Sequence, residues 1–225
     1  MRLISGTTAV AALMALVPET LAADSAVFRD SETGFTFSQY SAPYKIGKTI
    51  AFRVAVPSGA TPGQPYDAVI QVAAPNDVGW CGLAWGGRMT NDPLTVAWAN
   101  GQSAVVSSRF TTQHSFPQPY TGASYEVFRT GTKSNSTHWQ YTALCRGCTS
   151  FPASSSRNTT LNPNGANTFA FAYASGKPSN PSSNTSSFPV HDSYNYWSHD
   201  FASAANPDFV SLVARNSGRA LEFVA

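Results

Sequence analysis

Charged residues are scarce in this sequence. Lys and Arg number 14 and Asp and Glu number 12, which gives 12% charged residues and a formal net charge of +2. The basic residues are scattered along the chain, whereas a nucleic-acid interface needs them gathered in one patch or stripe. The composition therefore predicts no nucleic-acid partner, and charge alone identifies no other partner.

The sequence also lacks an apolar run long enough to cross a membrane, which takes about 20 residues. Its one long apolar stretch, residues 8–17, follows the positively charged Arg2 and precedes the small residues of 20–23. That order is typical of a secretory signal peptide. We therefore predict a signal peptide over residues 1–22 and a mature domain over residues 23–225, secreted to the extracellular space without a membrane anchor.

Several catalytic and cofactor motifs are missing. No G-x-G-x-x-G motif for flavin or nicotinamide and no G-x-S-x-G elbow of a serine hydrolase occurs. The predicted mature chain starts at Ala23 or Asp24, whereas a copper polysaccharide monooxygenase needs an N-terminal histidine. The Cys, His and Met residues have neither the order of a blue-copper site nor the spacing of a zinc site. A carboxylate-pair glycosidase stays open, because the sequence singles out no pair.

Only three cysteines are present. Cys145 and Cys148 lie close together in a chain that is expected to meet an oxidising compartment, which predicts a structural disulfide between them. Covalent haem attachment uses C-x-x-C-H, and Thr149 follows the second cysteine here, so that kind of site is excluded. Cys81 lies in an apolar segment and is predicted to be a buried free thiol.

Three N-glycosylation sequons lie in Ser/Thr-rich stretches that are typical of surface loops. Their acceptor residues are Asn135, Asn158 and Asn184. Glycosylation of this kind belongs to the secretory route that the leader also predicts. Together the two features indicate a secreted glycoprotein.

The mature chain predicts an all-β domain, because short β-branched or aromatic runs alternate with turn signals. Strands are expected at residues 49–56, 67–74, 80–85, 94–99, 104–109, 125–129, 138–144 and 168–174. Asn100-Gly101 is the best hairpin signal; residues 206–215 have the only helical pattern, and residues 176–187 form a long loop. A chain of this length predicts one antiparallel, immunoglobulin-like β-sandwich with long loops at one end.

A single methionine, Met89, remains outside the leader. It follows a Gly-Gly pair, which lets the backbone turn closely under a flat ligand. A thioether and an imidazole together close both axial positions of a haem iron. His191 and His199 lie in an aromatic segment with Tyr194, expected to be a loop, and are the candidate imidazoles. From these residues alone, a core methionine and exposed loop histidines remain the alternative.

Several segments, taken in order, resemble the haem b cytochrome domain of fungal cellobiose dehydrogenase and the related stand-alone secreted fungal cytochromes. The most specific match is a Gly-Gly-x-Met loop joined to a Trp-Ala-Asn-Gly hairpin. The matching segments run through nearly the whole mature chain and are residues 33–35, 86–92, 96–101, 107–109, 135–139, 145–149 and the stretch around His191.

The resemblance implies a DOMON-like β-sandwich whose loops at one end hold one haem b without a covalent bond. Met89 and His191 match the family's axial ligands, and Tyr194 is expected beside the same haem. His199 falls where the family requires no histidine and ranks second to His191. His114 stands where the family usually has a tyrosine near a haem propionate, so it is both a cofactor-binding candidate and a rival ligand.

The function that the resemblance implies is one-electron transfer by a monomeric carrier. The donor would be a flavoprotein sugar dehydrogenase, and the acceptor a copper polysaccharide monooxygenase or ferric iron. A ferric reductase would differ only in its acceptor. The flavin domain of the family's dehydrogenases has no counterpart in this sequence, so cellobiose oxidation is not assigned to it. The alternative is a haem-free carbohydrate-binding β-sandwich in which Trp197 or Tyr120 stacks on sugar rings.

Overall fold

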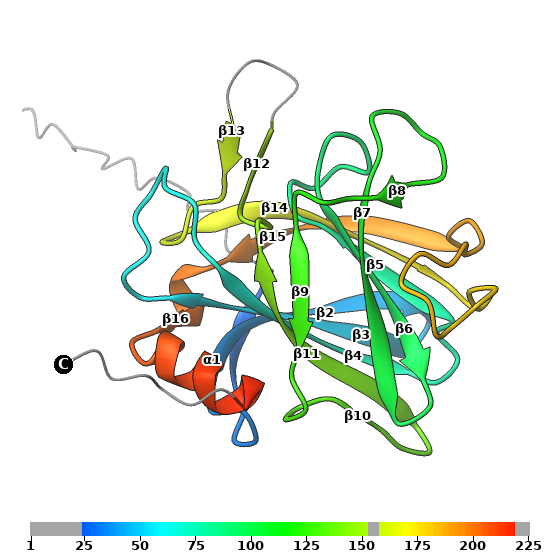
Figure 1. Ribbon diagram of the computed structural model, residues 1–225, viewed down its shortest axis with the longest axis horizontal. Helices are drawn as coiled ribbons and strands as arrows, with labels where there is room; N and C mark the ends of the chain where they lie inside the picture. The colour runs from blue at the N-terminus through cyan, green and yellow to red at the C-terminus, as the bar shows by residue number, and fades with distance from the viewer. Residues whose placement is uncertain (1–23, 153–157, 219–225) are drawn as a thin grey trace, which may run out of the picture.

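The structure, a computed structural model, describes residues 24–152 and 158–218. The predicted signal peptide, residues 1–22, lies outside these ranges. Two sheets, antiparallel in nearly all their strand pairs, pack against each other and enclose the main hydrophobic core (Figure 1). The predicted β-sandwich is therefore confirmed. No helix in the described ranges is both long and apolar enough to span a bilayer.

The first sheet has eight strands, with a path in the order β1-β2-β3-β4-β11-β10; β9 pairs with β11, and β16 runs parallel to β3. The strands are β1 (Ala26–Arg29), β2 (Thr36–Lys45), β3 (Lys48–Pro57), β4 (Ala68–Pro75), β9 (Ser124–Val127), β10 (Lys133–Ser134), β11 (His138–Arg146) and β16 (Ala205–Asn206). The sequence prediction missed β1 and β2. Pro43 lies within β2, where the register also shifts, and a proline argues against a regular strand.

The second sheet has six strands in the order β15-β14-β5-β6-β7-β8. They are β5 (Trp80–Ala84), β6 (Leu94–Asn100), β7 (Ser103–Phe110), β8 (Gln118–Pro119), β14 (Ala166–Ala174) and β15 (Ser193–Asp200). Outside the two sheets lie a hairpin of β12 (Ser150–Pro152) and β13 (Asn158–Thr160), a 3-10 turn η1 (Ala202–Ala204) and the helix α1 (Phe209–Ser217). The predicted C-terminal helix is thus present and starts three residues later than expected, at 209 and not 206.

The hairpin predicted at Asn100-Gly101 joins β6 to β7. Asn100 pairs with Ser103, so Gly101 and Gln102 are the two residues of the turn. Gly101 has a φ of 63°, a conformation that glycine adopts without the steric cost of a Cβ atom. The local turn chemistry therefore fixes the register between β6 and β7.

Large aromatic side chains fill the space between the sheets. Phe169 lies at the centre: its ring centroid is 5.6 Å from that of Trp85 and 5.6 Å from that of Trp197. Phe52 of the first sheet lies 5.8 Å from Trp197 and so joins the two layers. These side chains are at most 4% exposed. Their burial contributes to the apolar stabilisation that holds the two sheets together.

The aromatic segment near the C-terminus is a strand, β15, and not the predicted loop. Alternate residues of a strand point to opposite faces, and Trp197 and His199 point into the core with exposures of 4% and 0%. The Trp197 indole donates to His199 Nδ1 at 2.8 Å, and its ring stacks on Tyr40 at 4.5 Å. The expectation of an exposed His199 is therefore wrong, and so is that of Trp197 as a platform for sugar rings.

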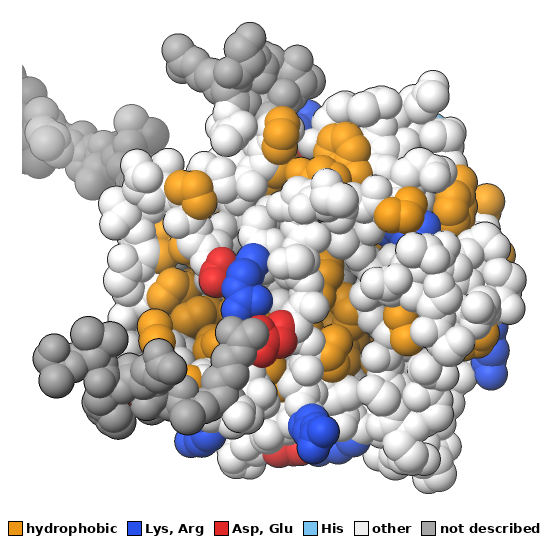
Figure 2. Space-filling view, in the orientation of Figure 1, with side chains coloured by type: hydrophobic (Ala, Val, Ile, Leu, Met, Phe, Trp, Pro, Cys, Tyr) orange, Lys and Arg blue, Asp and Glu red, His pale blue; other side chains and the backbone are white. Residues whose placement is uncertain are grey.

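The surface of the sandwich has few charged side chains, as the composition of the sequence predicts. The face drawn in Figure 2 has a few acidic and basic side chains among polar and apolar ones, and the largest charged group mixes both signs. Arg146 lies between two carboxylates, 3.8 Å from Asp67 and 3.2 Å from Glu126. Such exposed pairs contribute little to stability, so the fold depends on its core.

The buried His199 makes the stability of the fold depend on pH. Burial lowers the pKa of His199 to about 3, whereas an unfolded histidine titrates near 6.5. The unfolded chain therefore takes up the proton first, and stability falls as pH drops from about 6.5 towards 3. We expect the free energy of unfolding at pH 5 to be lower than at pH 7.5 by about 2 kcal/mol through this residue alone.

Urea unfolding of the protein and of His199→Gln at the two pH values measures this contribution. Glutamine keeps an acceptor for the Trp197 indole but has no titrating group. The variant should be less stable at pH 7.5 and should lose about 2 kcal/mol less between the two pH values. Equal losses in both proteins would show that His199 does not titrate as proposed.

Candidate functional site

A cavity of about 510 Å³ lies on the outer face of the second sheet. Its lining residues come from β5, β6, β14 and β15 and from the loop that joins β14 to β15, which is the gold loop in Figure 1. The lining includes Met89, His114, His191 and Tyr194, which are the four residues that the sequence predicted to bind a cofactor. His199 is not among the lining residues, because β15 turns it to the opposite face.

The floor of the cavity is made of small residues in two neighbouring rows across the sheet. Strand pairing aligns Ala170 with Ala84 and Ala172 with Gly82. At the ends of the rows stand larger side chains, which are Tyr196 and Leu94 in one row and Tyr194 and Val96 in the other. Because the central positions have one side-chain carbon or none, the sheet forms a shallow apolar trough that suits a flat ligand.

The sequence contains a signal for this floor that the predicted strands alone do not use. In β14, Phe169 and Phe171 alternate with Ala170 and Ala172, and at the end of β5 Leu83 stands between Gly82 and Ala84. Alternation of large and small side chains, both apolar, places a packed core on one face and a sterically open surface on the other.

One wall of the cavity is an aromatic cluster around Phe188. Its ring lies 4.8 Å from Trp80, 4.9 Å from Phe116 and 6.3 Å from Trp98. The Trp80 indole donates to the carbonyl of Pro189 at 3.1 Å, and the Trp98 indole donates to that of Pro181 at 2.8 Å. The loop between β14 and β15 is thereby fixed to β5 and β6 by bonds from rigid side chains.

Met89 is presented by the loop between β5 and β6. The Asp92 carboxylate, which is 0% exposed, accepts from the backbone N–H of Arg88 at 2.7 Å and from its guanidinium at 3.4 Å. Burial raises the pKa of Asp92, and the bonds from Arg88 oppose that rise. A Cβ atom on Gly86 would lie 2.5 Å from the Asp92 carboxylate. A glycine at position 86 is therefore needed for the close approach of this carboxylate, which holds the loop.

His191, just before β15, and its ring neighbour Tyr194, near the start of β15, also line the cavity. The His191 ring lies 5.2 Å from that of Tyr194 in an edge-on contact. The next residue, Asp192, fixes the backbone: its N–H donates to the carbonyl of Tyr173, and its carboxylate accepts from the N–H and hydroxyl of Ser175. These bonds from Ser175 lower the pKa of Asp192. These hydrogen bonds fix the backbone next to His191, just before β15 begins.

His114 lines the same cavity from the loop between β7 and β8. It is exposed, and the loop is closed by the Thr111 hydroxyl, which donates to the carbonyl of Gln113 at 2.6 Å. A ring on this loop reaches the cavity at its mouth, beside Phe116. His114 therefore stays a rival to His191 as an imidazole donor to the cavity.

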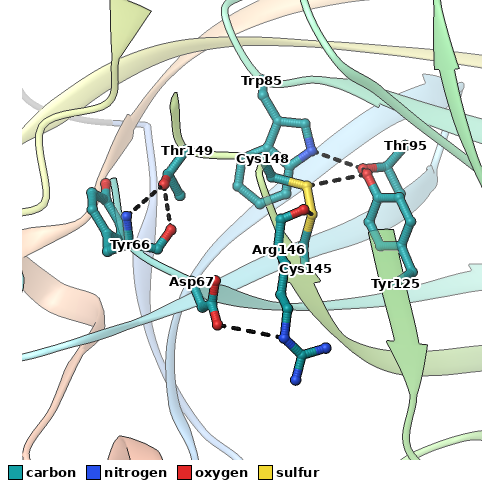
Figure 3. Close-up of a disulfide and its surroundings, with 9 residues drawn as sticks. All are labelled: Tyr66, Asp67, Trp85, Thr95, Tyr125, Cys145, Arg146, Cys148 and Thr149. Atoms are coloured by element: carbon teal, nitrogen blue, oxygen red, sulfur yellow. Dashed lines mark hydrogen bonds and ion pairs between the residues drawn. A yellow bond between two sulfur atoms is a disulfide. The ribbon is translucent and has the colours of Figure 1, made fainter. Parts of the chain in front are cut away.

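The predicted cysteine chemistry lies inside the sandwich and away from the cavity lining. A disulfide joins Cys145 to Cys148, with Cα atoms 5.9 Å apart (Figure 3). The Tyr125 hydroxyl lies 3.2 Å from the sulfur of Cys148 and 2.5 Å from the hydroxyl of Thr95. Cys81 is a free, buried thiol, and burial raises its pKa far above the ordinary value, so it is inert.

The three predicted sequon asparagines, Asn135, Asn158 and Asn184, are exposed. The side chain of Asn135 accepts from the backbone N–H and the hydroxyl of Thr137, the sequon's third residue. Their glycosylation remains a prediction.

The cavity residues fit a haem b. The walls are apolar, no lining residue is Lys, Arg, Asp or Glu, and the floor leaves room for a planar group. The cavity has a thioether, Met89, and an imidazole, His191, which are soft and borderline donors suited to a haem iron. In the described residues no group of three His, Cys, Asp or Glu gathers to hold a metal ion by itself.

Comparison with known proteins connects this site to a family. Residues 28–211 match the family described as the cytochrome domain of cellobiose dehydrogenase. The chain is also 28% identical over 177 residues to a pyrroloquinoline quinone-dependent pyranose dehydrogenase of Coprinopsis cinerea, a match that covers 78% of this chain. It spans only 23% of that longer relative.

Two solved structures share the fold. The cytochrome domain of Myriococcum thermophilum cellobiose dehydrogenase has a TM-score of 0.76 and 25% identity, over 87% of this chain and 97% of that one. The cytochrome b domain of pyranose dehydrogenase from Coprinopsis cinerea has a TM-score of 0.73 and 23% identity, over 86% of this chain and 96% of that one. In both cases the similarity covers nearly the whole of the matched cytochrome domain.

Loss of the Asp92 carboxylate should loosen the Met89 loop. Asp92→Ala leaves the N–H of Arg88 without its acceptor in a part-buried position, which costs about 1–3 kcal/mol of unfolding free energy. Glu32→Ala is the matched control, because Glu32 accepts from the N–H of Gly131 and from the Lys133 ammonium but is 39% exposed. Its loss should stay below about 1 kcal/mol. Chemical unfolding that gives equal losses would contradict the role assigned to Asp92.

Proposed function

Because the chain belongs to the family of cytochrome domains of cellobiose dehydrogenase, and this family implies haem b electron transfer, we propose that it carries single electrons on a haem b bound non-covalently between Met89 and His191. The observation that carries the proposal is the meeting of these two residues, far apart in the sequence, in one apolar cavity. A match to a family motif does not by itself bring two distant residues to the same cavity.

The two ligands would act as a closed axial pair. Held between a thioether and an imidazole, haem iron supplies a one-electron couple without an open position for oxygen or peroxide. Met89 approaches from a loop held by Asp92, and His191 from a segment held through Asp192. Because both segments are fixed by hydrogen bonds to their own backbone, the ligands would move little when the iron changes its charge.

The remaining lining residues exclude water and leave one edge open. Trp80, Leu94 and Phe188 cover the inner part of the cavity and are buried or half-buried. At the mouth, Phe116 is 41% exposed, Val190 82%, and Tyr194 57%. These side chains would form the contact surface for a redox partner, and such redox encounters are typically small and transient. Outer-sphere electron transfer needs no more than this.

We propose a dehydrogenase as the electron donor, since the matched relatives are named as sugar-oxidising dehydrogenases. A flavoprotein sugar dehydrogenase fits the cellobiose dehydrogenase family. The proposed acceptors are a copper polysaccharide monooxygenase or ferric iron, and the proposed setting is extracellular, with the protein as a monomer. The neutral lining of the cavity supports a docking surface that works by shape and apolar contact and not by charge.

Absorbance spectra of the ligand variants test the axial pair. The reduced protein should show the sharp α and β bands of low-spin haem, and Met89→Ala or His191→Ala should lose them, because one axial position opens. Circular dichroism of each variant checks that the sandwich remains folded. An unchanged reduced spectrum in either variant would rule out that residue as a ligand.

His114→Ala separates the rival histidines in the same experiment. Because His114 lies at the exposed mouth of the cavity, its loss should leave the α and β bands in place. Loss of the bands in this variant, with their retention in His191→Ala, would assign the imidazole ligand to His114.

A further inference from the structure

Arg109 of β7 is a buried arginine behind the wall of the cavity, and all three nitrogens of its guanidinium donate hydrogen bonds. It is 1% exposed. Its Nε donates to the hydroxyl of Ser107 at 2.6 Å, one terminal nitrogen donates to the carbonyl of Pro117 at 3.2 Å, and the other donates to the carbonyls of Asn184 and Ser186 at 3.1 and 2.6 Å. All four partners are neutral.

This guanidinium makes no ion pair with any residue in the described ranges 24–152 and 158–218. A buried charge without an opposite charge costs several kcal/mol, and arginine stays charged because its pKa is too high for it to release the proton. Carbonyl dipoles compensate only part of that cost. A neutral side chain would meet the needs of packing more cheaply, so the position of the charge calls for another explanation.

The geometry places Arg109 between the two loops that form the cavity wall. The Pro117 carbonyl belongs to the loop with His114 and Phe116, and the Asn184 and Ser186 carbonyls belong to the loop that leads to Phe188. The carbon at the centre of the guanidinium is 5.5 Å from the Phe116 ring and 5.2 Å from the Phe188 ring.

Ser107 completes the connection. Its hydroxyl donates to the carbonyl of Asn184 at 2.5 Å while it accepts from Arg109. The loop between β14 and β15 is thus attached to β7 by two neighbouring side chains of one strand. Both Phe116 and Phe188 line the cavity, so the charge lies within 5.5 Å of the centres of two rings of the cavity wall.

We propose that Arg109 is a positioning residue for the haem site with two effects. It fixes the two aromatic loops around the cavity, and its uncompensated charge favours the less positive, reduced state of the iron. The proposal rests on the proposed function for its second effect only. The first effect concerns loops that are present in the protein with or without haem.

Two substitutions of Arg109 separate position from charge. Arg109→Met removes both the four hydrogen bonds and the charge, whereas Arg109→Lys keeps the charge but has no planar fork to reach all four acceptors. Both variants should lose haem to apomyoglobin about tenfold faster or more, because buried bonds to a charged group are lost. Spectroelectrochemistry should give a lower midpoint potential for Arg109→Met, with Arg109→Lys remaining near the unaltered protein.

Arg53→Met is the matched control. Arg53 lies on β3 of the first sheet, is half-buried, stacks on Phe28 at 3.7 Å and donates to Gln39 and Gln71. Its loss should lower stability without changing the rate of haem loss or the midpoint potential. Equal changes in the Arg53 and Arg109 variants would overturn the proposal, and so would unaltered values in Arg109→Met. A potential in Arg109→Lys as low as that of Arg109→Met would overturn the charge effect.

Hydrogen exchange in the haem-free protein tests the loops by themselves. Ser107→Ala replaces a buried hydroxyl with a smaller group and keeps Arg109, so it remains a usable variant if Arg109→Met does not fold. Amides of residues 178–188 should exchange faster in Ser107→Ala, and faster still in Arg109→Lys, than in the unaltered protein. Unchanged exchange in both would overturn the positioning effect. If the unaltered protein takes up no haem, the proposed function fails, while this measurement still decides the first effect.

Discussion

The second sheet has to bury apolar surface on both of its faces, and the arrangement of the molecule follows from that requirement. On the inner face, Phe169 and Phe171 pack against the first sheet. On the outer face, Ala170 and Ala172 leave a floor that no other strand layer among the described residues covers. An antiparallel sheet in a sandwich normally exposes a polar face to water. Here loops and, in the proposed function, a planar cofactor take the place of a third layer.

The loops around this floor are built for fixed geometry. A buried carboxylate holds the Met89 loop, two indole N–H groups hold the loop before His191, and a buried guanidinium joins that loop to the one with His114. Each anchor is a rigid or charged donor or acceptor placed on a strand or at its end. Loops supply the chemistry, and the regular sheet determines where each loop begins.

Local patterns in the sequence predicted the sandwich, the hairpin after β6 and the helix α1, because alternation and turn chemistry depend on neighbouring residues. They also singled out Met89 with two candidate histidines, His191 and His199, and the resemblance to the cytochrome family ranked His191 first. Only the fold brings Met89 and His191 to one cavity. The inward direction of His199 was missed, because three aromatic residues in β15 hide the alternation of the strand. Arg109 lies in a segment that matches the family, residues 107–109, but no neighbouring residue indicated its role, because its partners are carbonyls of two loops distant in the sequence.

The open floor also links solubility to cofactor supply. A folded chain without a ligand presents an apolar trough rimmed by Val190, Tyr194 and Tyr196 to water, and exposed apolar surface of this kind promotes association between molecules. A ligand that binds only the folded state adds to its stability by mass action. For the proposed haem protein, loading would then serve as a maturation step, and a cell that produces the chain faster than it supplies haem would accumulate aggregation-prone molecules.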